Sequence, residues 1–171
     1  MKNSIYNQIV YGSLLHPKEL EKHGISMDMV EFVKVKNYKR VFNQEPSRRR
    51  ADTINRAVLN IVYDNSSWFN ALLIKGISEN SLKELDDREI GYDRVNLEDG
   101  SVTYYNNNKI AKNCFVYIGK DKKQSDDIFP NSEYFKLCLN GAKSHFEEFY
   151  QDYIKSTYQN TTDKKLELIL H

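Results

Sequence analysis

The sequence predicts a single domain of the α+β class, in which short strands form a sheet and a few helices pack against it. Its 171 residues suffice for one domain with a sizeable core, and no stretch has the composition of a linker between two domains. Twelve tyrosines and eight phenylalanines suit a strand-rich core, because aromatic rings pack well across a pleated sheet. We expect residues 1–160 to form the domain and residues 161–171 to form a C-terminal tail.

The N-terminal segment predicts a strand, a tight turn and a short helix. Residues 5–11 form a strand-like apolar run that leads directly into Gly12 and Ser13. A helix can start at Pro17, because proline is tolerated at the first helical position, and it ends before Gly24. A glycine turn between a strand and a helix exposes backbone N–H groups, which can bind an anion or a developing oxyanion.

A long strand and a polar loop are expected next. The interrupted apolar pattern of residues 29–43 predicts one long bent strand or two short strands that meet near Asn37. Residues 44–56 contain a proline and the arginine run 48–50 but no apolar period, which predicts a surface loop. Without interleaved aromatic residues this run indicates a solvated loop, with contact to an anionic group of a small substrate as the functional alternative.

The middle of the chain predicts two antiparallel hairpins and one further strand. Turn-forming residues separate the members of each pair, and Asp99-Gly100 is a strong tight-turn dipeptide. The expected pairs are residues 57–63 with 68–74 and residues 92–97 with 101–105, and residues 114–118 form the last expected strand.

The C-terminal part predicts the longest helix, over residues 132–158, with its cap at Ser132. Gly141 lies in the middle of this stretch, where a missing side chain lets two elements approach closely. His145 lies on the apolar stripe and no second metal-binding side chain accompanies it, so it is interpreted as a packing residue.

A shorter helix is expected to begin at Ser81, because Ser81 and Glu84 have the spacing of a capping box, and to end at Gly91. The apolar stripe of Leu82 and Leu85 leads on the same face into Asp86 and Glu89.

Glu89 is the candidate general base or acid. Near the C-terminal end of a helix, the helix dipole and partial burial both disfavour the charged form of a carboxyl group. The alternative is an ordinary surface ion pair between Glu89 and Arg88, Arg94 or Lys83.

The charge and cysteine content exclude several function classes. Lys and Arg number 25 against 24 Asp and Glu, so no global field favours nucleic acid or membranes. Cys114 and Cys138 are isolated, which predicts buried thiols rather than a disulfide or a metal site. Residues 1–15 are too polar for a signal peptide or a spanning helix, so we expect a cytoplasmic protein.

Two short stretches carry a resemblance to a known family: VYGSLL at 10–15 and LDDREIGYDRV at 85–95. With NYKRVFN at 37–43 and EYFKLCLNGA at 133–142, the chain resembles the gamma-glutamylcyclotransferase-like family over most of its length. This resemblance implies a small mixed or antiparallel barrel-like sheet with flanking helices.

The resemblance also implies an activity. Such an enzyme cyclises a γ-glutamyl group to 5-oxoproline and releases the attached amine, without a metal or another cofactor. It implies that Glu89 moves the protons. The residues implied to bind the substrate are Tyr11, Gly12, Ser13, Leu14, Tyr92 and Tyr117, with the backbone N–H groups of residues 12–14 facing its carboxylate or the oxyanion.

Two alternatives remain at this point. Ser13 is the rival nucleophile, although no histidine stands in a recognisable triad order. The other alternative is a non-catalytic module that uses the same pocket to bind a small γ-glutamyl-like ligand or a partner protein.

Overall fold

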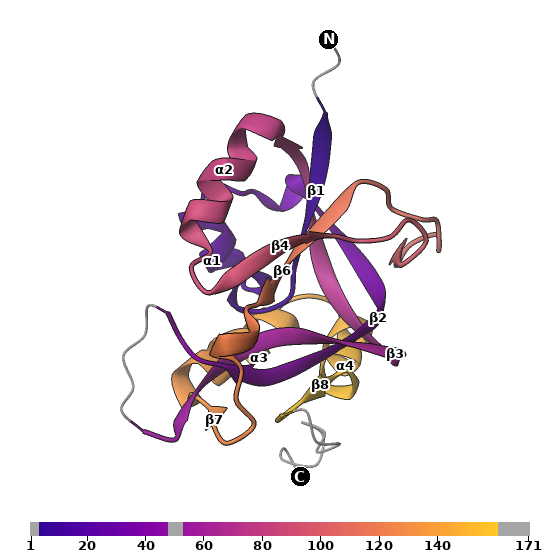
Figure 1. Cartoon of the computed structure of the whole chain (residues 1–171). Helices are drawn as coiled ribbons and strands as arrows, with labels where there is room; N and C mark the ends of the chain where they lie inside the picture. Colours follow the sequence, from indigo (N-terminus) through magenta and orange to yellow (C-terminus); the bar gives the residue numbers. More distant parts are fainter. Residues whose placement is uncertain (1–3, 48–52, 161–171) are drawn as a thin grey trace.

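The computed structural model describes residues 4–47 and 53–160, and it consists of a strongly bent mixed sheet with helices around it (Figure 1). The strands are β1 (Ile5–Val10), β2 (Val30–Gln44), β3 (Asn55–Ser78), β4 (Tyr92–Asn96), β5 (Val102–Tyr104), β6 (Cys114–Gly119), β7 (Phe129–Pro130) and β8 (Thr157–Tyr158). The helices are α1 (Pro17–Lys22), α2 (Glu79–Arg88), α3 (Ser132–Lys143) and α4 (Glu147–Lys155), with 3-10 turns η1 (Ser13–Leu15), η2 (Met27–Met29) and η3 (Asp121–Lys123).

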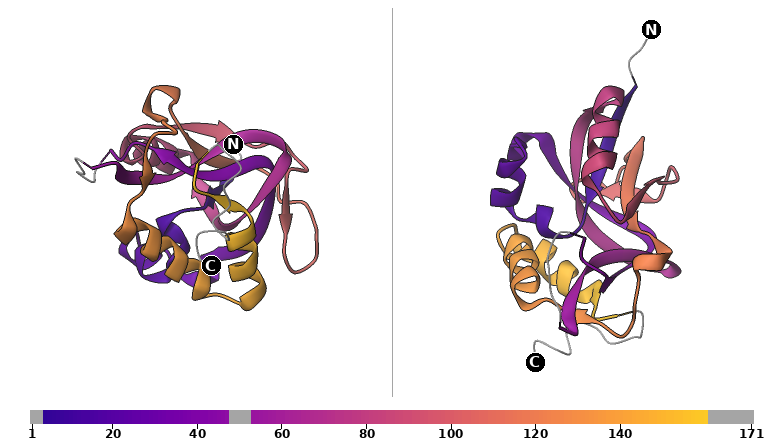
Figure 2. Two further views of the ribbon diagram at one scale, coloured as in Figure 1. Left: turned by 90° about the horizontal axis from the view of Figure 1, so that it is seen from below. Right: turned by 60° about the vertical axis from the view of Figure 1, so that its left-hand side comes forward.

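The strand order is β4-β6-β1-β3-β2-β5, while β7 pairs with β3 and β8 pairs with β2. The first strand, β1, therefore lies inside the sheet, antiparallel to β3 and parallel to β6. Both orientations occur, so the mixed sheet of an α+β fold is confirmed. Figure 2 shows α3 and α4 together on one side of the long β2–β3 ribbon, where both helices contact β3.

The first predicted hairpin is wrong. Residues 57–63 and 68–74 are two halves of one long strand, β3, and both halves pair antiparallel with the same neighbour, β2. The residues between them have the composition of a turn, but the structure accommodates them as a bulge because β2 offers a partner to each half.

The bend of this ribbon lies where residues 64–67 of β3 stand opposite Asn37 of β2. Asn37 has a φ of 74°, a left-handed conformation that asparagine tolerates better than most residues. The carboxylate of Asp64 accepts a hydrogen bond from the N–H of Ser66 at 3.0 Å, which closes a local turn. Of the two arrangements expected for this segment, the single long strand with a bend near Asn37 is the one observed.

The second predicted hairpin is also wrong. Residues 92–96 and 102–104 are strands, and Gly100 makes the expected turn between them with a φ of 92°. However, β4 pairs with β6 and β5 pairs with β2, so the chain leaves one edge of the sheet and joins the other. The short strands β7 and β8 follow β6, which is therefore not the last strand.

The predicted C-terminal helix is two helices, α3 and α4, and Asn131 rather than Ser132 caps the first. The helix breaks after Lys143, where the hydroxyl of Ser144 donates to the Gly141 carbonyl at 2.6 Å. A Cβ atom at Gly141 would stand 2.7 Å from the backbone nitrogen of His16. The close approach expected at Gly141 is thus confirmed, and it brings α3 against η1.

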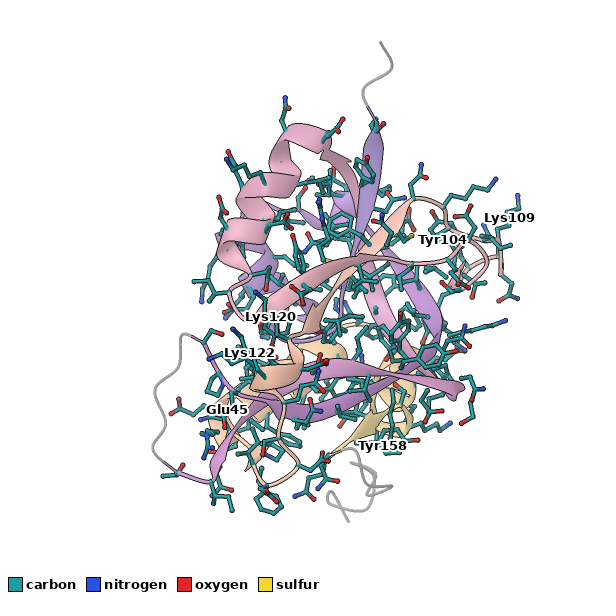
Figure 3. All side chains as sticks on the ribbon, in the orientation of Figure 1. Glu45, Tyr104, Lys109, Lys120, Lys122 and Tyr158 are labelled. Carbon is teal, nitrogen blue, oxygen red and sulfur yellow. The ribbon has the colours of Figure 1, made fainter. Side chains whose placement is uncertain are left out.

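Arg40 of β2 is fully buried and connects the C-terminal segment to the sheet. Its guanidinium donates to the Asn70 carbonyl at 2.5 Å, the Asn70 side-chain oxygen at 2.7 Å, Thr157 Oγ1 at 2.8 Å and Ser156 Oγ at 3.0 Å. Beside these contacts β8 lies along β2, near the labelled Tyr158 in Figure 3. The sequence analysis did not identify this residue.

Candidate functional site

A cavity of about 210 Å³ lies where the end of β1, the end of α2 and the start of η1 meet. It is lined by every residue that the sequence analysis named for the site: Tyr11, Gly12, Ser13, Leu14, Glu89, Tyr92 and Tyr117. These residues come from the turn after β1, the C-cap of α2 and the strands β4 and β6, so only the folded sheet brings them together.

The turn after β1 presents backbone donors to this cavity. The N–H groups of Leu15 and His16 close the 3-10 turn onto the carbonyls of Gly12 and Ser13, each at 3.0 Å. The N–H groups of Ser13 and Leu14 stand at the start of this turn and have no partner within it. Both residues line the cavity, so these donors can face an anionic group there.

Gly12 lines the cavity and also lies close to a side chain of the cavity wall. A Cβ atom at this position would stand 2.7 Å from the hydroxyl of Tyr134. Tyr134 is 8% exposed, and its hydroxyl accepts a hydrogen bond from the N–H of Leu59 at 3.4 Å. The missing side chain of Gly12 therefore leaves room for Tyr134, which lines the cavity.

Replacing Gly12 by alanine is expected to lower the unfolding midpoint and to weaken ligand binding, because Tyr134 must move. Overpacking of this kind typically costs about 1–3 kcal/mol. The added change Tyr134→Phe removes the obstructing oxygen, so the double variant should regain part of the lost stability in thermal unfolding. A double variant no more stable than Gly12→Ala would show that this contact is not the cause.

Helix α2 positions the carboxylate, but it begins earlier than predicted. Its cap is Ser78, whose hydroxyl accepts a hydrogen bond from the N–H of Ser81 at 3.3 Å. The capping box at Ser81 and Glu84 is therefore wrong, because Ser78 at the end of β3 already has the extended backbone that a cap requires.

Glu89 is the C-cap of α2, so the helix ends at Arg88, one residue before it. The apolar stripe of the helix precedes Glu89 in the chain. Leu82 and Leu85 are buried as predicted, and Glu89 is half-buried. Asp86, expected on the same buried face, is exposed. The buried stripe therefore leads to one carboxylate, that of Glu89.

The charge of Glu89 acts on the tyrosines of the cavity. Burial first, and then the charge of Glu89, raise the pKa of Tyr92. Burial is also the main cause of the raised pKa of Tyr11 and of Tyr117, and the charge of Glu89 contributes to both. All three tyrosines are thus neutral hydroxyl groups at neutral pH, and all three lie within reach of the field of one carboxylate.

Gln44 at the end of β2 and Ser47 in the loop after it hold the turn that carries Glu89. The hydroxyl of Ser47 donates to the Ile90 carbonyl at 2.7 Å, and the amide of Gln44 donates to the Gly91 carbonyl at 3.0 Å. Gly91 has a φ of 89°, and a Cβ atom there would stand 2.6 Å from Ser47 Oγ. Glycine is therefore needed at this position, and Glu89 stands on a fixed turn.

The hydroxyl protons of these tyrosines are committed to acceptors of the protein. Tyr11 donates to the backbone carbonyl of Tyr117 at 2.7 Å, and Tyr92 donates to the carbonyl of Leu59 at 3.0 Å. Tyr117 donates to the carboxylate of Asp86 at 2.8 Å. Because a hydroxyl has one proton, each oxygen can only accept a hydrogen bond from a ligand. The cavity thus has acceptors around Glu89 and donors at the turn after β1.

No hydrogen bond joins the side chain of Ser13 to a histidine ring within the described chain. The three histidines there have other contacts: His16 accepts from the N–H of Lys18, His23 lies against Arg88, and His145 lies against the Leu15 carbonyl. His145 also packs edge-on against Phe32 with centroids 5.0 Å apart, which agrees with its interpretation as a packing residue. This geometry gives Ser13 no imidazole base within residues 4–47 and 53–160.

Other predictions concern features outside the cavity. Cys114 and Cys138 are buried free thiols, as expected. Within the described residues no group of three His, Cys, Asp or Glu side chains is arranged to hold a metal ion. None of the described helices is long and apolar enough to cross a membrane. The arginine run 48–50 and the tail 161–171 lie outside the described residues.

Ten further residues line the cavity that the sequence analysis did not name for the site, among them Gln8, Pro46, Ser47, Arg88 and Tyr134. Ser47 lies in a polar loop, and Tyr134 has the pattern of an ordinary core residue of a helix. Gln8 gave a signal, because it is a polar residue inside the apolar run of β1.

Comparison with known proteins supports the fold. No protein-family model matches the sequence, and no curated protein sequence matches it. A solved gamma-glutamyl cyclotransferase matches with a TM-score of 0.65 at 15% identity, over 98% of both chains. An uncharacterized Homo sapiens protein matches with a TM-score of 0.67 at 17% identity, over 97% of this chain and 98% of the other.

A third solved structure, YkqA from Bacillus subtilis, matches with a TM-score of 0.64 at 18% identity. The match covers 86% of this chain and 52% of YkqA, so the aligned part spans about half of that protein's length. The chain therefore has the fold seen in gamma-glutamyl cyclotransferase structures.

Proposed function

We propose that this protein is a gamma-glutamyl cyclotransferase, which converts a γ-glutamyl compound into 5-oxoproline and the free amine. The observation that carries the proposal is the division of the cavity into an acceptor side and a donor side. Among the lining residues, Glu89 and three tyrosines supply acceptor oxygens, while Ser13 and Leu14 supply N–H groups that the 3-10 turn does not use. The fold shared with gamma-glutamyl cyclotransferases supports the same function.

This division suits the end of a γ-glutamyl group that carries both charges. An α-ammonium has three donors and matches the carboxylate and the tyrosine oxygens, which cannot donate to it. An α-carboxylate has only acceptors and matches the turn. A hydrophobic ligand would leave all of these polar groups without partners, at a cost in free energy.

The chemistry follows from where the ammonium lies. Beside Glu89 it can lose a proton to the carboxylate, and the free amine then attacks the γ-carbonyl of the same molecule. The bond to the amide nitrogen breaks, and this nitrogen takes the proton that the protonated Glu89 returns. The new ring nitrogen loses its second proton to the released amine, which leaves as an ammonium. One carboxyl group thus serves as base and then as acid, and the reaction needs neither water nor Ser13 as nucleophile.

The decisive experiment follows the atoms of the reaction. Purified protein is incubated with γ-glutamyl compounds in heavy-oxygen water, and the products are identified by mass spectrometry. We expect 5-oxoproline without solvent oxygen in its ring carbonyl, and an equal amount of released amine. Free glutamate with one heavy oxygen in its γ-carboxylate would show hydrolysis and would return Ser13 to consideration.

Acetylation of the substrate's α-amine is expected to abolish turnover, because the nitrogen lone pair is then delocalised into an amide. Turnover of the acetylated compound would contradict cyclisation. Tight binding of the unmodified compounds without any product would instead support the non-catalytic binding module.

A further inference from the structure

Gln8 is a buried polar side chain in the middle of β1 whose amide has no partner. It is 4% exposed, and its neighbours Ile9 and Val10 belong to the hydrophobic core. No hydrogen bond joins its side-chain amide to any other residue of the described chain. Buried amides are normally hydrogen-bonded, because an unpaired one costs free energy.

The amide nitrogens of other buried amides in the strands do have acceptors, although Gln44 Oε1 has no partner among the described residues. Asn60 donates to Asn43 at 3.1 Å, Asn70 donates to the Phe149 carbonyl at 2.7 Å, and Gln44 donates to the Gly91 carbonyl. Gln8 differs in one further respect, because it lines the cavity. Its amide atoms are not among the fully enclosed polar atoms that lack a partner in the described chain, so they keep contact with the open space there.

The strand register places Gln8 among apolar neighbours on the side of the sheet that faces α2. It pairs with Ile74 of β3 and with Phe115 of β6, and Phe115 packs edge-on against Tyr117 at 5.9 Å. Phe115 and Tyr117 form one cluster with Leu82 and Leu85 of α2. An apolar residue would suit this position better for stability, so the amide fits a contact made by a ligand.

We propose that Gln8 is a specificity residue that hydrogen-bonds the group attached to the γ-amide nitrogen of the substrate. This inference rests on the proposed function, in which the turn after β1 and the acceptors around Glu89 hold the two charges of the γ-glutamyl group. The side-chain amide of Gln8 is then available to bind the part of the substrate that leaves as the amine.

This assignment selects a class of leaving group. The amide of Gln8 offers two donors and one acceptor, so it matches a carboxylate or a peptide group. It does not match a hydrocarbon chain, which would leave the amide unpaired in an apolar surrounding. The preferred substrates are therefore γ-glutamyl compounds whose leaving amine is an amino acid or a peptide, rather than a plain alkylamine.

Two matched substrates test this preference. γ-Glutamylalanine and γ-glutamylethylamide share the reacting group and differ by the carboxylate of the leaving amine. The variant Gln8→Met keeps the length of the side chain and removes its hydrogen-bonding groups. We expect it to lower kcat/KM for γ-glutamylalanine about 10- to 100-fold, the usual effect of losing a hydrogen bond to a charged group.

The same variant should change kcat/KM for γ-glutamylethylamide by less than about threefold, since that substrate has no partner for Gln8. Gln8→Glu keeps the shape and adds a negative charge, so it should impair γ-glutamylalanine more than γ-glutamylethylamide. Thermal unfolding of both variants checks that the fold is intact.

Equal losses with both substrates would overturn the inference, because Gln8 would then contact the shared γ-glutamyl part or act on stability. Unchanged kinetics of Gln8→Met with both substrates would overturn it as well. After either of these results, release of 5-oxoproline by the wild-type protein would still support the proposed function. Wild-type protein that turns over neither substrate would instead overturn the proposed function, and this inference with it.

Discussion

Replacing Glu89 by glutamine is expected to lower turnover of γ-glutamyl substrates by about two to four orders of magnitude, the usual contribution of general acid–base catalysis. The amide has the same shape but cannot take the proton from the α-ammonium. Because Glu89 lies on the turn after α2 and not in its core, the fold should persist. Steady-state kinetics and thermal unfolding, measured on the same preparation, separate the two effects.

Glu84→Gln is the matched control, since Glu84 is an exposed carboxylate on the same helix. It should leave turnover unchanged. Full activity of Glu89→Gln with an intact unfolding transition would remove Glu89 from the mechanism. If Asp86→Asn were the inactive variant while Glu89→Gln remained active, the carboxylate that supports Tyr117 would be the one that matters.

Replacing Arg40 by methionine is expected to lower the free energy of unfolding by about 3 kcal/mol. The change leaves buried acceptors on Asn70, Ser156 and Thr157 without their donor, and each unsatisfied acceptor costs about 1–3 kcal/mol. Removing the guanidinium also removes the cost of burying its charge, which offsets part of this loss. The net loss of stability is therefore smaller than the sum of the costs of the separate unsatisfied acceptors. Urea unfolding followed by circular dichroism measures the difference.

Arg56→Met provides the comparison for Arg40. Arg56 forms an ion pair with Glu45 at 2.6 Å, but this pair lies at the surface, where water screens it. We expect little change in stability from this variant. If Arg40→Met were no less stable than Arg56→Met, the hydrogen bonds around Arg40 would not hold the C-terminal segment on the sheet.

Local patterns in the sequence predicted most strands and failed on their partners. Residues 92–96 and 102–104 have strand patterns and a genuine turn between them, yet they pair with β6 and β2. The runs on either side of residues 64–67 likewise share β2 as a partner. An apolar pattern reports that a strand is buried, whereas its partner depends on residues far along the chain.

The positions of site residues were predicted better than the physical reasons for them. The seven named residues do line one cavity, because the resemblance rested on short segments that form its walls. The close approach of Gly12 to Tyr134 was not predicted, because Tyr134 lies on a helix more than a hundred residues later. The cap at Ser78 was missed because Ser81, one turn later, has the same side chain and a suitable spacing.

The central position of β1 has a consequence for how the chain folds. This strand is made first, but its two neighbours in the sheet come later: residues 72–78 pair on one side and residues 114–116 on the other. Contacts so distant in sequence close slowly, because the intervening chain must lose its freedom before they form. A growing chain that has not yet reached β6 leaves one edge of β1 unpaired, with apolar residues beside it. Synthesis must therefore pass Tyr134 in α3 before the wall of the cavity is complete, and truncation before β6 leaves an exposed strand edge prone to aggregation.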